Sequence, residues 1–170
     1  KKSILVFLMK KELKIFIGIF LCLAASRFVP HPGNFTSLLA LSFYVPAILG
    51  IRYIPFLIIS FAITDFIIGY HNLTHWTWGS VFLIGFLPIY FKNSFKLRIP
   101  GALTGAVVFF LITNFGVWST GQYGYNLEGL IACYTLAIPF FTSSFVATLL
   151  FSLIIEGIYY LYSNKLIEKS

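Results

Sequence analysis

Residues 37–70 read SLLALSFYVPAILGIRYIPFLIISFAITDFIIGY, and this stretch decides the fold. It holds two apolar runs, residues 37–51 and 54–70, which are separated only by a short basic turn at Arg52 and Tyr53. A membrane-spanning helix needs about 20 predominantly apolar residues. The second run approaches that length, and the first is short for it. The stretch therefore indicates two helices that cross a bilayer and are joined by a tight turn.

The composition of the whole chain requires lipid as its solvent. Only 10% of the 170 residues are charged and 59% are apolar, with 20 Phe and 10 Tyr among them. A soluble domain has about a quarter of its residues charged and just under half apolar. The net charge of +7 would suit nucleic acid in a soluble protein. Here short basic loops on one side of a membrane account for it, so nucleic acid is not expected as a partner.

Six apolar spans can be drawn along the chain, with a shorter apolar helix before the last of them at residues 128–139. No internal repeat or linker interrupts them. We therefore predict a single integral membrane domain over residues 1–170, an all-α membrane protein that forms a six-transmembrane-helix bundle. The predicted spans are residues 13–29, 37–51, 54–70, 77–91, 101–120 and 140–162.

Cations and aromatic residues lie at opposite ends of these spans. The three His and three Trp fall near the ends of odd-numbered spans, and eleven of the twelve Lys and Arg fall near the other ends, with Arg27 the exception. Cytoplasmic loops carry an excess of Lys and Arg, so both termini are predicted to be cytoplasmic. For the tryptophans, anchoring at the membrane interface is the alternative to a binding role. The eleven cations are Lys1, Lys2, Lys10, Lys11, Lys14, Arg52, Lys92, Lys96, Arg98, Lys165 and Lys169.

Asp65 is the polar residue of greatest interest because it lies within a span. An ionisable side chain inside a membrane is costly and marks a pathway or a binding site by default. It lies about one and a half helical turns before His71, near the outer surface. The alternative is a structural ion pair with Arg27, which would neutralise both charges and hold span three against span one. Such a pair is compatible with a cavity framed by both residues.

Other polar residues allow two interpretations each. Asn114, which follows Thr113 in span five, either binds a ligand or joins neighbouring helices. His71 and His75 are four residues apart, a spacing that suits metal ligands on one helical face, but they lie in a loop without further carboxylates, and no metal site is expected. Glu156, in the cytoplasmic half of span six, pairs with an inside lysine or contacts a neighbouring subunit.

Four motifs give the chain a resemblance to known proteins. Residues 32–36, 65–71, 113–118 and 129–134 carry Pro-Gly-Asn-Phe-Thr, Asp-Phe-Ile-Ile-Gly-Tyr-His, Thr-Asn-Phe-Gly-Val-Trp and Gly-Leu-Ile-Ala-Cys-Tyr. They are similar to the motifs of an uncharacterised family of small bacterial integral membrane proteins. The order of features in the first 70 residues resembles the S-component, the substrate-binding subunit, of energy-coupling factor (ECF) vitamin transporters. These features are an N-terminal span with a stripe of small residues, the run 32–36, a short second span, a tight basic turn and a third span that ends in residues 65–69. This resemblance implies a multi-pass protein of the bacterial cytoplasmic (inner) membrane and a pocket near its outer face.

The function expected from these observations is the capture of a small vitamin-like or aromatic molecule, without enzymatic activity and without a cofactor. The expected partners are this ligand, membrane lipid and, as the resemblance implies, a transmembrane coupling subunit with ATPases. Two alternatives are an accessory or structural subunit of a larger membrane complex, and a membrane-embedded enzyme that uses Asp65 with His71 as an acid–base pair. The expected substrate-binding residues are Asn34, Asp65, His71, Asn114, Trp118 and Tyr123.

Overall fold

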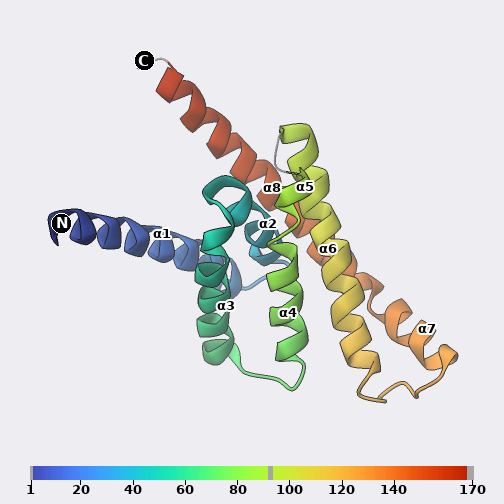
Figure 1. Cartoon of the computed structure of the whole chain (residues 1–170). Helices are drawn as coiled ribbons and strands as arrows, with labels where there is room; N and C mark the ends of the chain where they lie inside the picture. Colours follow the sequence, from blue (N-terminus) through green and yellow to red (C-terminus); the bar gives the residue numbers. More distant parts are fainter. Residues whose placement is uncertain (1, 92–93, 168–170) are drawn as a thin grey trace.

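The computed structural model describes residues 2–91 and 94–167, with side chains described for residues 9–91 and 94–163. All regular secondary structure in these residues is helical, as predicted (Figure 1). Of the cations used to assign the topology, Lys1, Lys92 and Lys169 lie outside the described residues. The helices are α1 (Lys2–Phe28), α2 (Leu38–Leu49), the 3-10 helix η1 (Ile51–Tyr53), α3 (Ile54–Ile68), α4 (Thr74–Ile84), α5 (Pro88–Phe91), α6 (Phe95–Trp118), α7 (Leu127–Leu136) and α8 (Ile138–Ile167).

The tight turn between the first two apolar runs is made by a glycine and η1. Gly50 has φ 105°, a conformation that glycine adopts without steric cost, and its N–H donates to Pro46 O to end α2. Tyr53 N then donates to Gly50 O over 3.1 Å. The Tyr53 hydroxyl donates to Glu12 Oε1 over 3.1 Å, which fixes the turn against α1. The basic turn is thus part of the packed structure.

The prediction that residues 77–91 form a single helix, the fourth span, is wrong. α4 ends at Ile84, and the next residues form a turn in which Leu87 N donates to Ile84 O. A Cβ on Gly85 would lie 2.9 Å from Ile54 Cδ1, so glycine permits the close approach of α4 to the start of α3 here. Pro88 has no N–H to continue the helix and begins the separate α5.

The loop left between the predicted spans 77–91 and 101–120 is shorter than expected, because α6 begins at Phe95 and includes Pro100. Pro100 is the sixth residue of α6, beyond the first turn, so it removes one backbone hydrogen bond within the helix. Lys96 and Arg98 therefore lie on the first turns of a helix. This places Arg98 where it can face α8.

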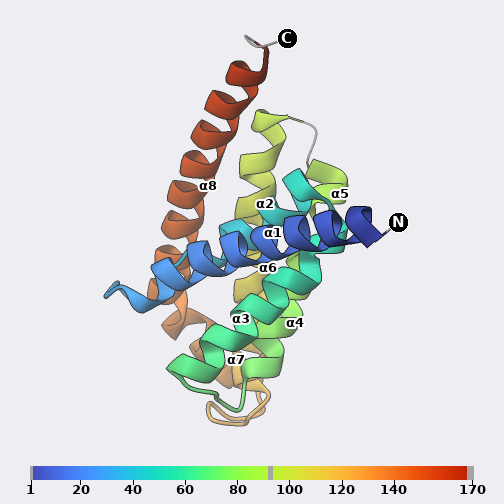
Figure 2. The same cartoon turned by 90° about the vertical axis from the view of Figure 1, so that its left-hand side faces the viewer.

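The helices α3, α4 and α6 lie lengthwise beside one another, with α8 inclined against α6 (Figure 1). Helix α2 lies at the centre and contacts α3, α4, α6 and α8. In Figures 1 and 2 helix α1 runs across the direction of α4 and α6, and packs chiefly on α3. Both α3 and α6 start at the end where α5 lies, so Arg52 and Arg98 share one end of the bundle, and the loop with His71 and the α6–α7 loop lie at the other.

Large side chains of α2 form the centre of the core. Eight of its twelve residues are buried, and Phe43 and Tyr44 are almost wholly inaccessible. Leu57 of α3 and Ile84 of α4 pack into the same cluster. Small residues of α6, such as Ala102, complete it, because they let this helix approach α2 closely.

Within the described residues, three helical segments are long and apolar enough to cross a membrane: Ile51–Ile68, Phe95–Trp118 and Ile138–Ser163. They indicate a membrane protein. Helix α2 has 12 residues, which corresponds to about 18 Å against a hydrocarbon core of about 30 Å. The predicted second span is therefore too short to cross alone, and the count of six spans stays a prediction.

Replacing Gly101 by alanine is expected to destabilise the bundle. A Cβ at this position would lie 2.6 Å from Phe43 Cε2 and from Phe91 Cβ, inside the packed core. Overpacking of this kind costs about 1–3 kcal/mol. The free energy of unfolding of the detergent-solubilised protein measures the effect. Gly18→Ala is the matched control, because no atom lies within 4 Å of its Cβ; unfolding free energies of Gly101→Ala at or above that of the original chain would contradict the prediction.

Candidate functional site

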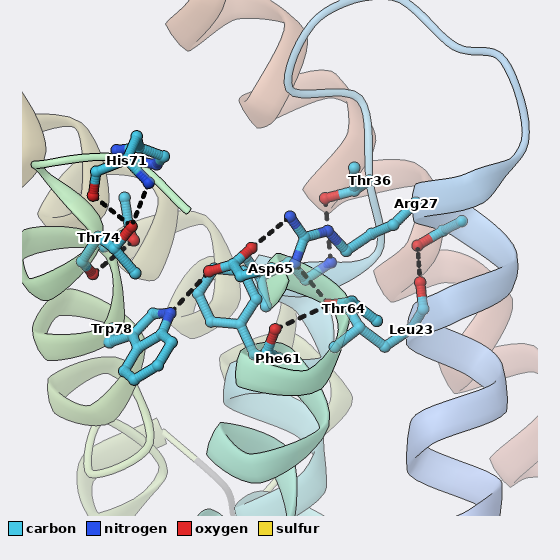
Figure 3. A network of polar contacts seen from close by, with 12 residues as sticks. Leu23, Arg27, Thr36, Phe61, Thr64, Asp65, His71, Thr74 and Trp78 are labelled. Carbon is cyan, nitrogen blue, oxygen red and sulfur yellow. Dashed lines mark hydrogen bonds and ion pairs between the residues drawn. The ribbon is translucent and has the colours of Figure 1, made fainter. Parts of the chain in front are cut away.

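The candidate site is centred on an ion pair between α1 and α3. Arg27 Nη2 lies 2.6 Å from Asp65 Oδ1, and the two side chains are 14% and 8% exposed (Figure 3). The structure thus brings together the two residues that the sequence had suggested as a pair. Because the charges cancel within a largely buried contact, the pair holds α1 against α3 without leaving an isolated charge.

Three further side chains complete the surroundings of this pair. Arg27 Nη1 donates to Thr64 Oγ1 over 2.6 Å, and its guanidinium carbon lies 4.7 Å from the centre of the Phe61 ring. Trp78 Nε1 donates to Asp65 Oδ2 over 2.6 Å (Figure 3). Both carboxylate oxygens therefore have partners, from two different helices. A buried carboxylate needs such partners, because a buried charge without a counter-ion and hydrogen bonds is costly.

The local fold places Arg27 at the last turn of α1 and fixes the chain that follows it. Ser26 Oγ lies 2.8 Å from Ser37 Oγ and accepts a hydrogen bond from Ser37 N over 3.1 Å. This clamp joins the end of α1 to the start of α2. The loop between them includes Asn34, which has φ 63°; asparagine tolerates this left-handed conformation better than most residues.

Two adjoining cavities, of about 270 and about 250 Å³, lie beside the ion pair. The first extends between α6 and α8 and is walled by phenylalanine rings. The second is bounded by Arg27 and Asp65. The cavities share five lining residues, which shows that they meet. The shared residues are Asn34, His71, Thr77, Phe109 and Ser144.

Four of the six predicted binding residues line these cavities. Asn34 and His71 line both, Asp65 lines the second, and Asn114 lines the first. Asn114 Nδ2 donates to Phe110 O over 2.8 Å, so its amide is oriented by its own helix. His71 Nδ1 accepts from Leu73 N over 3.2 Å, which puts the proton of a neutral ring on Nε2.

Trp118 and Tyr123 do not line either cavity. The Trp118 ring packs on Phe115 and Tyr125, with centroids 5.5 and 6.3 Å away. Tyr123 lies in the loop after α6, where Gly121 has φ 79° and turns the chain. The loop thereby gives Trp118 neighbours within its own segment. The aromatic type of Trp118 and Tyr123 and their position near the outer end suggested that they line the pocket. Neither property specifies the direction in which the loop folds.

Sequence reasoning missed several lining and bridging residues. Trp78 had been considered as an interface anchor, yet it bonds Asp65. Thr77 and Ser144 line both cavities from α4 and α8. Phe109 of α6 also lines both cavities. Such residues carry no sequence signal beyond a hydroxyl or a ring in an apolar segment, which usually indicates ordinary helix packing.

The alternative chemistries receive no geometric support within the described part of the chain. No group of three His, Cys, Asp or Glu residues that could hold a metal ion occurs there. His75 packs on the Trp76 ring, 5.6 Å between centroids. Both oxygens of Asp65 contact Arg27 or Trp78, and no hydrogen bond between Asp65 and His71 is found among the residues from 9 to 91. An acid–base role for that pair stays an untested hypothesis.

A second buried ion pair lies toward the other end of the bundle. Arg98 of α6 donates through Nε and Nη2 to the two carboxylate oxygens of Glu156 of α8, each over 2.6 Å. Their side chains are 13% and 5% exposed. The partner of Glu156 is thus an arginine of the same chain, rather than the lysine or the neighbouring subunit expected from the sequence. The bidentate geometry is the strongest that these groups form.

The fold and the paired cavities define a helical membrane protein with a polar and aromatic site at one end. The chain belongs to a family described as "Family of unknown function (DUF6580)", whose model matches residues 7–169. No curated protein and no solved structure matches the chain.

Proposed function

We propose that this chain is a membrane substrate-binding protein that captures a small vitamin-like or aromatic molecule near the outer face of the bacterial inner membrane. The observation that carries the proposal is the meeting of two cavities at Asn34 and His71, with Asn114 on one side and Asp65 on the other. Apolar walls with a few oriented polar groups are the usual composition of small-molecule sites. The cavities lie toward the end opposite Arg52 and Arg98, which the positive-inside bias assigns to the outside.

The proposed arrangement keeps the six predicted segments of an ECF S-component-like bundle and both cytoplasmic termini, with the 12-residue α2 enclosed by its neighbours rather than crossing alone. The sequence contains no Gly-x-x-x-x-Gly-Lys motif to bind the phosphates of ATP. Transport driven by ATP would therefore depend on a partner, a transmembrane coupling subunit with its ATPases. Lipid surrounds the exposed apolar faces of α3, α6 and α8.

Native mass spectrometry of the detergent-purified protein tests the proposal directly. We expect a retained small molecule on the original chain and a lower occupancy of Asn114→Leu. The dissociation constant of this variant should rise about tenfold, because a buried hydrogen bond is worth about 1–1.5 kcal/mol. Gln122→Leu is the control, because Gln122 is exposed and lines neither cavity. Equal occupancy in the two variants would place the ligand elsewhere.

The same spectra separate the alternatives. A co-purifying polypeptide without a small molecule would favour an accessory subunit. A membrane-embedded enzyme would require a measured turnover that is lost when Asp65 or His71 is changed. A bare protein with neither would refute the substrate-binding proposal.

A further inference from the structure

The first cavity offers a ligand flat aromatic walls. Phe109, Phe110, Phe140 and Phe141 line it from α6 and α8. The Phe110 and Phe141 rings lie 4.7 Å apart between centroids at an interplanar angle of 41°. Aromatic rings prefer tilted or edge-to-face neighbours of this kind. A flat ring of the ligand is the group that such walls contact best.

Three polar side chains of the same cavity have already used hydrogens on their own helices. Thr77 Oγ1 donates to Thr74 O, and Thr113 Oγ1 donates to Phe109 O, each over 2.8 Å. Asn114 Nδ2 donates to Phe110 O over the same distance. A hydroxyl has one hydrogen and two lone pairs, and an amide oxygen only accepts. The two hydroxyls therefore offer oxygen lone pairs, and Asn114 offers its oxygen and one remaining N–H. The oxygen acceptors common to all three residues are matched by N–H or O–H groups of a ligand.

The charges at the two cavities leave no excess for a charged ligand. Arg27 and Asp65 are the only Lys, Arg, Asp or Glu residues among the described lining residues, and they pair with each other at 2.6 Å. A carboxylate or an ammonium group would therefore meet no Lys, Arg, Asp or Glu charge that is not already paired. The lining histidines, His31 and His71, each have Nδ1 in a hydrogen bond with the backbone of their own loop. Burying such a charge is costly. The site therefore favours molecules without a net charge.

From these three observations we infer that the ligand is an uncharged molecule with a flat aromatic part and an N–H or O–H donor on or near that ring. The inference rests on the proposed function, because it describes the ligand of that same site. The aromatic part lies among the phenylalanines of the first cavity, and the donor faces the oxygen atoms of Thr77, Thr113 or Asn114.

Four indole compounds separate these requirements on the purified full chain in lipid nanodiscs. Indole is neutral and has an N–H donor, 1-methylindole lacks the donor, indole-3-acetate is an anion, and tryptamine is a cation. Ligand-detected NMR titration gives the four dissociation constants. We expect indole to bind about five to ten times more tightly than each of the others, the effect of one hydrogen bond or one desolvated charge.

A matched pair of threonine variants locates the donor's partner. Thr113→Val and Thr104→Val each remove a hydroxyl that bonds a carbonyl of α6, but only Thr113 lines a cavity. Thr104→Val is expected to keep the preference for indole over 1-methylindole. Thr113→Val or Asn114→Leu is expected to reduce that preference to less than about twofold, a difference of less than about 0.4 kcal/mol.

The possible failures are distinguishable. Binding of 1-methylindole, indole-3-acetate or tryptamine as tight as that of indole would overturn the inference and leave the proposed function standing. So would a preference for indole that survives in each of Thr77→Val, Thr113→Val and Asn114→Leu. Absence of binding by all four, together with no small molecule in native mass spectra, would refute the proposed function and this inference with it.

Discussion

Asp65→Leu is expected to lower the free energy of unfolding by about 3–5 kcal/mol, because it leaves the buried Arg27 charge without its partner. The replacement also removes the acceptor of Trp78 Nε1. Titration with denaturant in detergent micelles, followed by tryptophan fluorescence, measures the loss. Trp78 itself lies at the site and should report the change.

The double variant Arg27→Met/Asp65→Leu is the informative control for this prediction. Replacing both members of a buried ion pair by apolar residues of similar size is often neutral or stabilising. We therefore expect the double variant to recover most of the lost stability. The stability of Asp65→Asn should be close to that of Asp65→Leu, because the amide has no charge to pair with Arg27. Its oxygen can still accept the hydrogen bond from Trp78. A double variant as unstable as Asp65→Leu would show that the contact does not act through charge balance.

The helical class of this protein was predictable from the sequence, because apolar runs bounded by basic turns leave few alternatives in lipid. The proximity of Arg27 and Asp65 could also be anticipated. Arg27 is the one cation near the outer ends of the spans, and Asp65 is the acid that lies near the outer end of a span. In an apolar environment such charges have few stable partners except one another.

The helix breaks were less accessible to sequence reasoning. The apolar character of residues 77–91 continues through the turn at Gly85, so hydropathy does not reveal where α4 ends. Pro100 is a helix breaker by type, yet it lies within α6. Both outcomes depend on tertiary packing, in which a close approach or a few missing backbone bonds are balanced by contacts elsewhere.

The cavities were only partly predictable for a related reason. Asn34, His71 and Asn114 are polar residues where a helix or loop faces the outer side, and their type already suggested a site. Ser144 has the same chemistry as many hydroxyls that merely bond their own helix. The rotation of α8 against α6 determines which of these hydroxyls lines a cavity. Helices in lipid have little amphipathicity, so the sequence does not indicate this rotation.

The second ion pair lets the contribution of each pair be measured independently. Glu156→Leu is expected to cost about 3–5 kcal/mol because it removes the carboxylate to which Arg98 Nε and Nη2 donate. Arg98→Met/Glu156→Leu is expected to recover most of this loss. The same denaturant titration measures both.

Glu128→Leu is the matched control for this pair, because Glu128 is exposed in the first turn of α7; we expect it to change stability by less than about 1 kcal/mol.

The two pairs share no residue, since one joins α1 to α3 and the other α6 to α8. The losses from Asp65→Leu and Glu156→Leu should therefore add to within about 0.5 kcal/mol. Only the first pair bounds the cavities, so the second double variant should keep its bound small molecule. A larger deviation from additivity, or loss of that molecule, would mean that the two ends of the bundle are energetically coupled.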